Sequence, residues 1–482
     1  MRRITNETEF EELSRDAGII VIRPADAFVA ESDGEVMAVF EDARRRGLSV
    51  TPRGGGTSIP SQAVGPGIVL LQRRDGTVVE DGSVRCGPSR VKSDLNRELD
   101  PLGRWIPPDP SSYESCTVGG MVANNSSGTR TFKYGSTVDF VRELRVILPE
   151  EGVKTVRAMP LEEAQHSDPT TRRVAALIVE NQKIIREEMP RVTKNSCGYR
   201  LEKVVHDGVF DLPKLFVGSE GTLGVVTDIT FATPPKPKSR ALLIVETSLD
   251  GLDKVVAIFR KLGPSAVELV DKSVFRQTGK EERLKALSKT DEEYLVFCEL
   301  DGVGRDDAGR TLEGASESEI SGYDPLALSD PGELAAAMGV RNEILTIAQE
   351  IRVGTRALLP GVEDLVAPPE RLGDLVALLK GQFEGRGLPY ISYGHAGDAN
   401  LHMRPLLDPN SAGERRVLEE IMEECFEKVW RMGGSITGEH GDGMLRAKYV
   451  ARQYPKTHGL MKQIREAYDP KGLLSPGVKI LR

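Results

Sequence analysis

The sequence predicts an α+β protein that is built from more than one domain. Strand-like and helix-like segments alternate from the N-terminus to about residue 232, and the alternation resumes after a break. The break, TPPKPKSR at residues 233–240, is rich in proline and lysine and is the best domain boundary in the chain. A chain of 482 residues is also too long for one hydrophobic core, so two or three domains are expected.

The elements of the first half follow from local patterns. Residues 35–46 have helical spacing with four apolar side chains on one face, and Gly47 is suited to end that helix. Residues 48–52, 67–71 and about 141–148 are predicted strands, because short apolar runs there are bounded by glycine and proline.

The pattern of strands and helices expected in the second half of the chain predicts a second, smaller α+β domain. Residues 241–247 are expected to form a strand and residues 250–263 a helix. Residues 266–271 and 293–300 are further apolar strands, and residues 411–431 have the spacing of an amphipathic helix.

Composition and charge narrow the function classes. The net charge is −9, and no basic run would follow a phosphate backbone, so a nucleic-acid partner is not expected. The first residues, MRRITNETEF, lack the apolar core of a signal peptide. No stretch approaches the roughly 18 apolar residues of a membrane span. We therefore expect a cytoplasmic protein, either free or peripheral at the inner face of the membrane.

The five cysteines are scattered and include no C-x-x-C pair. This pattern argues against a disulfide framework, a thiolate zinc site and an iron–sulfur cluster. If electrons leave the protein in single steps, another polypeptide must carry them.

Three glycine-rich stretches suggest close approach of the backbone to a ligand. Residues 54–56 are three consecutive glycines after a predicted strand, where free N–H groups form either a pyrophosphate-binding nest or a plain tight turn. They match neither G-x-G-x-x-G nor the P-loop. Residues 107–135 are dense in Gly, Ser, Thr and Asn, and residues 218–224 are expected to lie between two apolar strands.

Three of the six histidines lie in two short stretches near the C-terminus. His395 and His402 flank the turn at residues 397–400 of an expected hairpin, and Glu439 and His440 lie between glycines in GEHGDG. Two imidazoles and a carboxylate form a borderline metal-ligand set, and a further His is a proton acceptor near neutral pH. A purely structural role for the histidines is the simpler alternative, but a structural zinc site is usually closed by four ligands and rich in Cys.

These motifs together carry a family resemblance. PRGGGTS, PDPSSYESCTVGGMVANNSSGTRTFKYGS and LFVGSEGTLGVVTDITF resemble the FAD-binding domain of the vanillyl-alcohol oxidase superfamily. From about residue 20 to DPKGLLSPGVKIL, the chain is similar to its FAD-linked 2-hydroxyacid dehydrogenases, which include D-lactate dehydrogenase, the glycolate oxidase flavin subunit and D-2-hydroxyglutarate dehydrogenase.

The resemblance implies an α+β fold with a two-subdomain FAD-binding domain of the PCMH type at residues 1–232. It also implies an α+β cap domain with an antiparallel sheet at residues 233–432. Residues 433–482 would return to the FAD domain and the active site.

The resemblance also implies a set of FAD-binding residues. The pyrophosphate would be wrapped by Arg53, Gly54, Gly55, Gly56, Thr57 and Ser58. The cofactor groove would be lined by Gln62, Pro108, Asp109, Thr117, Gly119, Gly120, Asn124, Ser126, Gly128 and Gly135, and the adenosine side by Glu220, Gly221, Gly224 and Val225. Because the triple-glycine loop contains no His or Cys, non-covalent FAD is expected.

In the resembling dehydrogenases, the positions that match His395, His402 and Glu439 bind a divalent metal, and the position that matches His440 is the general base. Zinc is the expected ion, with manganese and iron as alternatives. Asn400, in the hairpin turn, is a further candidate catalytic residue.

A substrate carboxylate also needs a planar arginine as its counter-charge. Arg341, Arg356 and Arg404 are the candidates. Arg404 is preferred, because strand alternation places it on the same face as His402.

The expected reaction is oxidation of a D-2-hydroxy acid to a 2-oxo acid, with D-lactate first and glycolate or D-2-hydroxyglutarate as alternatives. Electrons would pass to a separate acceptor, which is an iron–sulfur subunit, a quinone or an electron-transfer flavoprotein. An oxidase that uses O₂ and a non-catalytic flavin subunit are the competing hypotheses. A homodimer is a further expectation.

Overall fold

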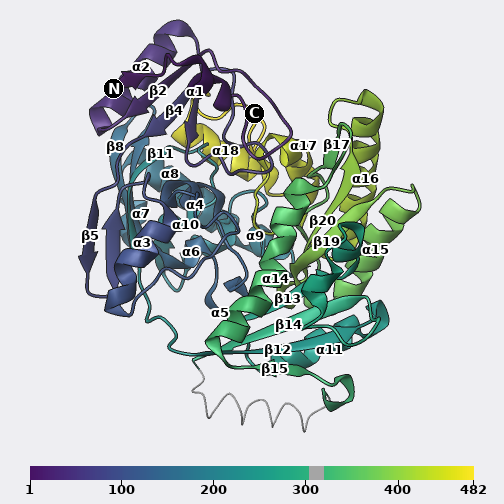
Figure 1. Cartoon of the computed structure of the whole chain (residues 1–482). Helices are drawn as coiled ribbons and strands as arrows, with labels where there is room; N and C mark the ends of the chain where they lie inside the picture. The colour runs from purple at the N-terminus through teal and green to yellow at the C-terminus, as the bar shows by residue number, and fades with distance from the viewer. Residues whose placement is uncertain (303–319) are drawn as a thin grey trace.

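The computed structural model describes residues 1–302 and 320–482. Its strands form three sheets, two of them smaller and on the left in Figure 1, and the largest on the right. Helices and mainly antiparallel sheets occur throughout, so the predicted α+β class is confirmed. Within the described residues, no helix is both long and apolar enough to cross a membrane.

The first sheet has the strand order β1-β2-β4-β3. Its strands are β1 (Arg2–Arg3), β2 (Asp26–Ala30), β4 (Ile68–Gln72) and β3 (Val50–Arg53), and its helices are α1 (Glu7–Glu12) and α2 (Asp33–Arg46). The predicted helix is confirmed as α2, and its buried face packs against β2, β3 and β4. Gly47 ends α2 at φ +64°, a left-handed conformation that glycine adopts without strain.

The second sheet is antiparallel and has the order β5-β6-β11-β7-β8-β10-β9. Its strands are β5 (Thr77–Glu80), β6 (Ser83–Cys86), β11 (Val225–Ala232), β7 (Val141–Leu148), β8 (Gly152–Pro160), β10 (Val209–Asp211) and β9 (Val205–His206). The helices of this region are α3 (Lys92–Leu99), α4 (Val118–Asn124), α5 (Thr131–Tyr134), α6 (Thr137–Phe140), α7 (Leu161–Gln165), α8 (Pro169–Glu180), α9 (Gln182–Glu188) and α10 (Pro213–Phe216).

One predicted element of this sheet is wrong. Residues 215–217 were expected to form a strand before the glycine-rich turn, but the chain forms the short helix α10 there. Pro213 is the first residue of α10, a position where its fixed φ favours a helix and its missing N–H costs nothing. The strand after the turn, β11, is present as expected.

The third sheet carries nine strands in the order β15-β12-β14-β13-β19-β20-β17-β16, with β18 also paired to β20. Its strands are β15 (Leu326–Leu328), β12 (Arg240–Thr247), β14 (Tyr294–Asp301), β13 (Ala266–Asp271), β19 (Tyr390–His395), β20 (Asn400–Leu407), β17 (Arg356–Leu358), β16 (Arg352–Val353) and β18 (Leu365–Val366). All of the pairings are antiparallel, which confirms the expected antiparallel sheet.

Helices cover both faces of this sheet. They are α11 (Leu249–Lys261), α12 (Ser273–Gln277), α14 (Pro331–Glu350), α15 (Leu372–Glu384) and α16 (Ala412–Arg431). Alternate side chains of β12 point to opposite faces, so Leu243 joins the core under α11 while Leu242 joins the core under α14. Figure 1 shows α14 between the third sheet and the first half of the chain.

The last segment of the chain returns to the first sheet. After α17 (Gly443–Gln453) and α18 (His458–Tyr468), Leu474 forms a parallel bridge with Val50 of β3. The N–H of Val50 donates to Leu473 at 2.8 Å, and the N–H of Ser475 donates to Val50 at 2.9 Å. We propose a division of the chain at residues 233–239, with this C-terminal segment belonging to the first unit.

Candidate active site

A hairpin in the third sheet positions the first two histidines. Strands β19 and β20 form the hairpin that the sequence predicts, and they pair with Tyr393 opposite His402 and His395 opposite Asn400. The turn closes through Ala399 at φ +50°. The imidazole rings of His395 and His402 are buried, and their centroids lie 5.2 Å apart.

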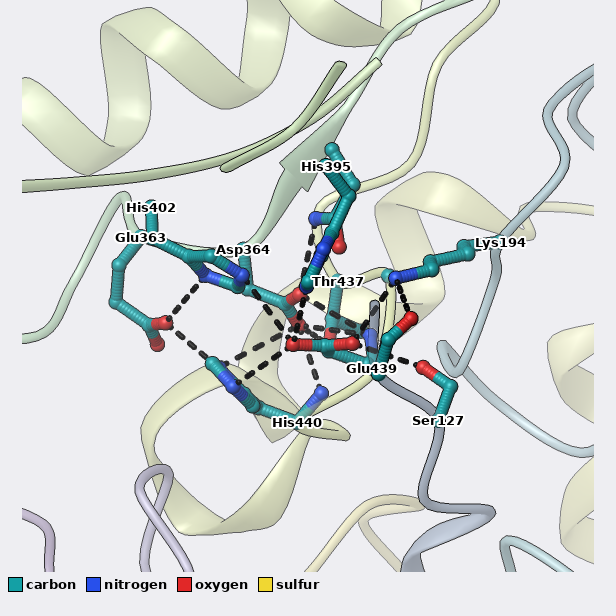
Figure 2. Close-up of polar contacts among 12 residues, drawn as sticks. Ser127, Lys194, Glu363, Asp364, His395, His402, Thr437, Glu439 and His440 are labelled. Carbon is teal, nitrogen blue, oxygen red and sulfur yellow. Dashed lines mark hydrogen bonds and ion pairs between the residues drawn. The ribbon is translucent and has the colours of Figure 1, made fainter. Parts of the chain in front are cut away.

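The loop at residues 438–442, named here the GEH loop, brings Glu439 and His440 to this hairpin. Glu439 Oε1 lies 3.4 Å from His395 Nε2, 3.2 Å from His402 Nε2 and 3.4 Å from His440 Nε2. Figure 2 shows the three rings around this carboxylate. We call His395, His402, Glu439 and His440 the imidazole cluster.

The spacing in the imidazole cluster fits a divalent metal. Two ligand atoms at about 2.1 Å from one ion, at tetrahedral or octahedral angles, lie roughly 3.0–3.4 Å apart. The three distances between Glu439 and the imidazole nitrogens fall in or at the edge of that range. Imidazole nitrogen and carboxylate oxygen are the donors that zinc, manganese and iron accept.

The second oxygen of Glu439 is held by residues of the first half of the chain. Ser127 Oγ donates to Glu439 Oε2 at 2.8 Å, and the buried Lys194 Nζ donates to it at 3.1 Å. Burial raises the pKa of Glu439, but Lys194 and His395 outweigh burial and hold it well below its usual value. Glu439 is therefore an ionised carboxylate with one oxygen fixed and the other directed at the three imidazoles.

Two further carboxylates hold the outer nitrogens of two of the three rings, those of His395 and His440. Glu268 Oε1 of β13 lies 2.8 Å from His395 Nδ1, and Glu363 Oε2 lies 2.6 Å from His440 Nδ1. Both acids are buried. A carboxylate at Nδ1 fixes the ring orientation and leaves Nε2 free for a metal or a proton.

Buried arginines balance these two acids. Arg341 Nε lies 2.9 Å from Glu268 Oε2, and Arg446 contacts Glu363 Oε1 at 2.6 Å. Burial lowers the pKa of His440, but Glu363 and Asp364 outweigh burial and raise it to about 10. The same negative surroundings favour a cation inside the cluster.

Asp364 orders the GEH loop. Its carboxylate accepts from the backbone N–H of Glu439 at 3.1 Å and of His440 at 2.9 Å, and from Thr437 Oγ1 at 2.5 Å. Asn400 Nδ2 also donates to Asp364, at 3.1 Å. Asn400 is therefore buried behind the GEH loop, where it supports Asp364, and it does not line the large cavity described below.

Two metal-ligand sets can be drawn from these residues. Asp364, His402, Glu439 and His440 have ligand atoms within 4.8 Å of one another, a set that omits His395. We favour His395 over Asp364 as the metal ligand. The Asp364 carboxylate already accepts hydrogen bonds from the GEH loop, whereas His395 Nε2 faces Glu439.

The imidazole cluster opens onto a cavity of about 1100 Å³. The three candidate arginines lie differently with respect to it. Arg404 lines the cavity, and its Nε has no hydrogen-bond partner among the residues that the structure describes. Arg341 also lines the cavity but is paired with Glu268. Arg356 lies on the surface, where it pairs with Glu414 at 2.7 Å, because β17 lies toward the outer edge of the sheet.

Most of the predicted FAD-binding residues line a second cavity, of about 130 Å³. They are Arg53, Gly54, Gly55, Gly56, Thr57, Ser58, Gln62, Thr117, Gly119, Gly120, Asn124, Ser126, Glu220, Gly221, Gly224 and Val225. Asp109 and Gly128 instead line the large cavity, and Pro108 and Gly135 line neither. A Cβ on Gly55 would lie 2.5 Å from Ser115 O, so only glycine allows the backbone this close. Backbone lining of this kind fits a flat, phosphate-bearing cofactor.

Two of these residues connect the second cavity to the imidazole cluster. Gln62 Nε2 donates to His440 O at 2.6 Å. The Glu220 carboxylate accepts from the N–H groups of Asp442 at 2.9 Å and Gly443 at 2.8 Å, and pairs with Lys479 at 2.9 Å. The side chain of Glu220 therefore holds the end of the GEH loop.

Sequence reasoning missed Ser127, Lys194, Glu268, Glu363 and Asp364. A signal was present for the acids. Glu268 is the one acid inside the apolar run AVEL, and residues 363–364 interrupt the apolar run of GVEDLVA. An acid inside a buried strand needs a partner, which makes it a candidate site residue. We find no comparable pattern for Ser127 or Lys194.

Comparisons with known proteins agree with this geometry. Residues 234–478 match the family described as FAD linked oxidases, C-terminal domain, and residues 24–157 match the FAD binding domain family. A D-lactate dehydrogenase of Anaerostipes hadrus is 29% identical, with 94% of this chain and 89% of the relative covered. The glycolate oxidase subunit GlcD of Bacillus subtilis is 28% identical, with 94% and 88% covered.

A D-2-hydroxyglutarate dehydrogenase of Pantoea ananatis is 28% identical over 96% of this chain, which spans about half (49%) of that relative. Among solved structures, p-cresol methylhydroxylase with substrate bound has a TM-score of 0.72 and 13% identity, with 99% of this chain and 94% of that chain covered. That likeness shows the fold alone. Residues from both of the matched regions form the candidate site. This chain therefore belongs to the FAD-linked oxidase family, and its fold is of the vanillyl-alcohol oxidase type.

Proposed function

We propose that the protein is an FAD-dependent, metal-assisted dehydrogenase of D-2-hydroxy acids, with D-lactate as the first candidate substrate and glycolate or D-2-hydroxyglutarate next. One observation carries the proposal. Three imidazole Nε2 atoms surround one oxygen of Glu439 at the wall of a cavity that residues of the FAD-binding half also line. The relatives with named 2-hydroxy acid substrates support the same chemistry.

The residues of this chain have distinct roles in the proposed reaction. FAD would supply the hydride acceptor, and a divalent ion held by His395, His402 and Glu439 would lower the pKa of the substrate hydroxyl. Arg404 would bind the substrate carboxylate, since Arg404 lines the cavity and its contact with Glu363, at 4.0 Å, is long. A divalent ion bound beside His440 would offset the negative charge of Glu363 and Asp364 that raises its pKa. His440 would then be neutral and would take the hydroxyl proton at Nε2 while Glu363 holds its Nδ1.

Anaerobic flavin reduction tests the proposal. The protein is loaded with FAD and, in separate samples, with zinc, manganese or iron, and then mixed with D-lactate, L-lactate, glycolate or D-2-hydroxyglutarate without any acceptor. We expect a D-2-hydroxy acid to bleach the oxidised-flavin absorbance in at least one metal-loaded sample. If no hydroxy acid bleaches a flavin that dithionite can reduce, the proposed function is wrong.

Replacement of His440 separates catalysis from a non-catalytic flavin subunit. We expect His440→Ala to slow flavin reduction by about 10²–10⁴-fold, the usual contribution of a general base. His166→Ala is the matched control, because His166 is exposed in the first half of the chain. Equal reduction rates for the wild type and His440→Ala would exclude His440 as the base and favour the non-catalytic alternative.

The electron acceptor is a separate question. We propose that reduced FAD passes its electrons to another polypeptide or to a quinone. Reoxidation with O₂, a soluble quinone and an electron-transfer flavoprotein, compared at equal concentration, decides this point. Stoichiometric hydrogen peroxide at a rate that matches turnover would show an oxidase instead.

A further inference from the structure

The two oxygens of the Glu439 carboxylate lie in different surroundings. Oε1 lies between 3.2 and 3.4 Å from the three imidazole Nε2 atoms of the cluster. Oε2 accepts from Ser127 Oγ at 2.8 Å and from Lys194 Nζ at 3.1 Å. Figure 2 shows Ser127 and Lys194 on one side of Glu439 and the rings of His402 and His440 on the other. One oxygen is therefore directed at the imidazoles, while two donors occupy the other.

Both donors belong to the first half of the chain, beside the residues that line the two cavities. Ser127 follows Ser126, which lines the second cavity, and precedes Gly128, which lines the large one. Lys194 Nζ also donates to Gly128 O at 3.1 Å. The hydroxyl and the ammonium that hold Oε2 are therefore fixed to one short segment of backbone.

Lys194 also contacts the hairpin that carries the first two histidines. Its Nζ lies 3.6 Å from Asp398 Oδ2, in the turn between β19 and β20. Both side chains are buried, and neither carboxylate oxygen of Asp398 has a hydrogen-bond partner among the residues that the structure describes. Movement of the ammonium away from Glu439 and Asp398 would leave two buried carboxylates without their counter-charge. Lys194 is therefore a firmly held donor to Oε2.

The number of Glu439 oxygens that bind a metal decides whether the metal has room for a substrate. A carboxylate binds a metal through one oxygen or through both. With both oxygens, Glu439, His395 and His402 would fill four positions, the number of a closed structural zinc site. With Oε1 alone they fill three, and a substrate oxygen can take the fourth.

We propose that Ser127 and Lys194 are positioning residues that keep Glu439 a one-oxygen metal ligand and thereby keep a coordination position open for the substrate. Both act through Oε2 and not by contact with the substrate. Each hydrogen bond to a charged oxygen favours the one-oxygen arrangement by about tenfold or more. The inference rests on the proposed function, because it takes His395, His402 and Glu439 as the metal ligands.

A crystal structure of the zinc-loaded wild type with FAD bound tests the inference without any variant. We expect one Glu439 oxygen at about 2.0–2.2 Å from zinc, and the other outside bonding distance and still in contact with Ser127 and Lys194. Two bonded oxygens overturn the inference and leave the proposed function in place. Absence of zinc from the imidazole cluster overturns the inference together with the metal assistance in the proposed function.

Removal of the two donors should close the open position. Ser127→Ala removes one donor, and the double variant Ser127→Ala/Lys194→Met removes both. In protein loaded with Mn²⁺ and FAD, the relaxation rate of water protons reports how many exchangeable water molecules the ion holds. We expect the double variant to hold about one water fewer than the wild type, because Oε2 then binds the ion. Equal numbers of waters in a folded double variant overturn the inference.

Metal and substrate affinities separate positioning from a merely structural role. A site that is only loosened binds the metal more weakly. We expect instead that the metal Kd of Ser127→Ala does not rise, while the apparent Kd of the hydroxy acid that reduces the flavin rises about tenfold. Weaker metal binding with an unchanged hydroxy-acid Kd would show a structural role and overturn the inference.

Ser196→Ala is the matched control. Ser196 is buried, and its Oγ donates at 3.0 Å to Gly438 O, next to Glu439 in the GEH loop. The variant therefore removes one buried hydrogen bond to the same loop without touching the carboxylate. We expect it to lower the melting temperature about as much as Ser127→Ala, with both Kd values within twofold of the wild type. If it reproduces the hydroxy-acid shift of Ser127→Ala, loop stability explains that shift and the inference is wrong.

Discussion

Replacement of Glu268 by Gln should weaken metal binding without touching a metal ligand. Glu268 is buried and makes two charge-assisted contacts, to His395 Nδ1 at 2.8 Å and to Arg341 Nε at 2.9 Å. Hydrogen bonds to charged groups contribute about 1.5–3 kcal/mol and neutral ones about 0.5–1.5 kcal/mol. The neutral amide should therefore lose about 1–1.5 kcal/mol at each contact.

The two losses appear in different measurements. The Arg341 contact should reduce the free energy of unfolding, whereas the His395 contact should reduce metal affinity. A loss of about 1.4 kcal/mol corresponds to tenfold weaker metal binding. This value lies at the lower end of the 10–100-fold effect that is usual for a carboxylate behind a metal-bound imidazole. The expected result is a tenfold rise in the Kd for the metal.

Titration of metal-free protein with zinc, manganese or iron, followed by calorimetry and by recovery of flavin reduction, gives the Kd. Glu299→Gln is the matched control, because Glu299 is a buried acid of the same sheet that pairs with Arg130 at 2.8 Å and lies outside the imidazole cluster. It should lose stability but keep its metal affinity. A Kd for Glu268→Gln within twofold of the wild type would refute His395 as a ligand and favour the set that contains Asp364.

Three further outcomes are expected. Arg404→Ala should weaken hydroxy-acid binding about 10–100-fold in anaerobic titrations, because a charge-assisted contact to the substrate carboxylate is lost. Arg356→Ala should stay within twofold of the wild type in the same titrations, since Arg356 is exposed and pairs with Glu414; the opposite order would contradict the site. Burial lowers the pKa of Lys92 to about 7, from 10.5. The unfolded chain therefore binds more protons between pH 7 and 10.5, and the free energy of unfolding should rise with pH across that window, by at most about 5 kcal/mol. Lys92→Met should lack this rise in urea unfolding at pH 7 and 10, and parallel pH curves for the two proteins would exclude the effect.

Local patterns in the sequence were sufficient for some elements of the fold, including one that forms part of the candidate site. The helix α2 could be predicted because its apolar spacing and Gly47 act within one segment. The hairpin of β19 and β20 could be predicted because a short glycine-containing turn forces its two strands together. The association of His395 with His402 followed from that hairpin.

The outer carboxylates could not be placed from the sequence. Glu268 reaches His395 because β13 pairs with β19, with Leu269 opposite Gly394. No local pattern in the sequence indicates which distant strands are neighbours in a nine-stranded sheet. Arg356 illustrates the reverse error, because its sequence context suggested a ligand for a carboxylate, but β17 carries it toward the edge of the sheet, where Glu414 is available.

The GEH loop has a consequence for how the chain folds. Its contacts span long stretches of sequence: 378 residues to Gln62, 312 to Ser127 and 245 to Lys194. Contacts of such separation form slowly, because the entropy of closing long loops is lost before the contacts stabilise the fold. The geometry of the imidazole cluster should therefore be among the last parts of the molecule to appear during refolding, well after its helices. A partly folded chain would then carry its histidines without yet holding them at a reactive distance.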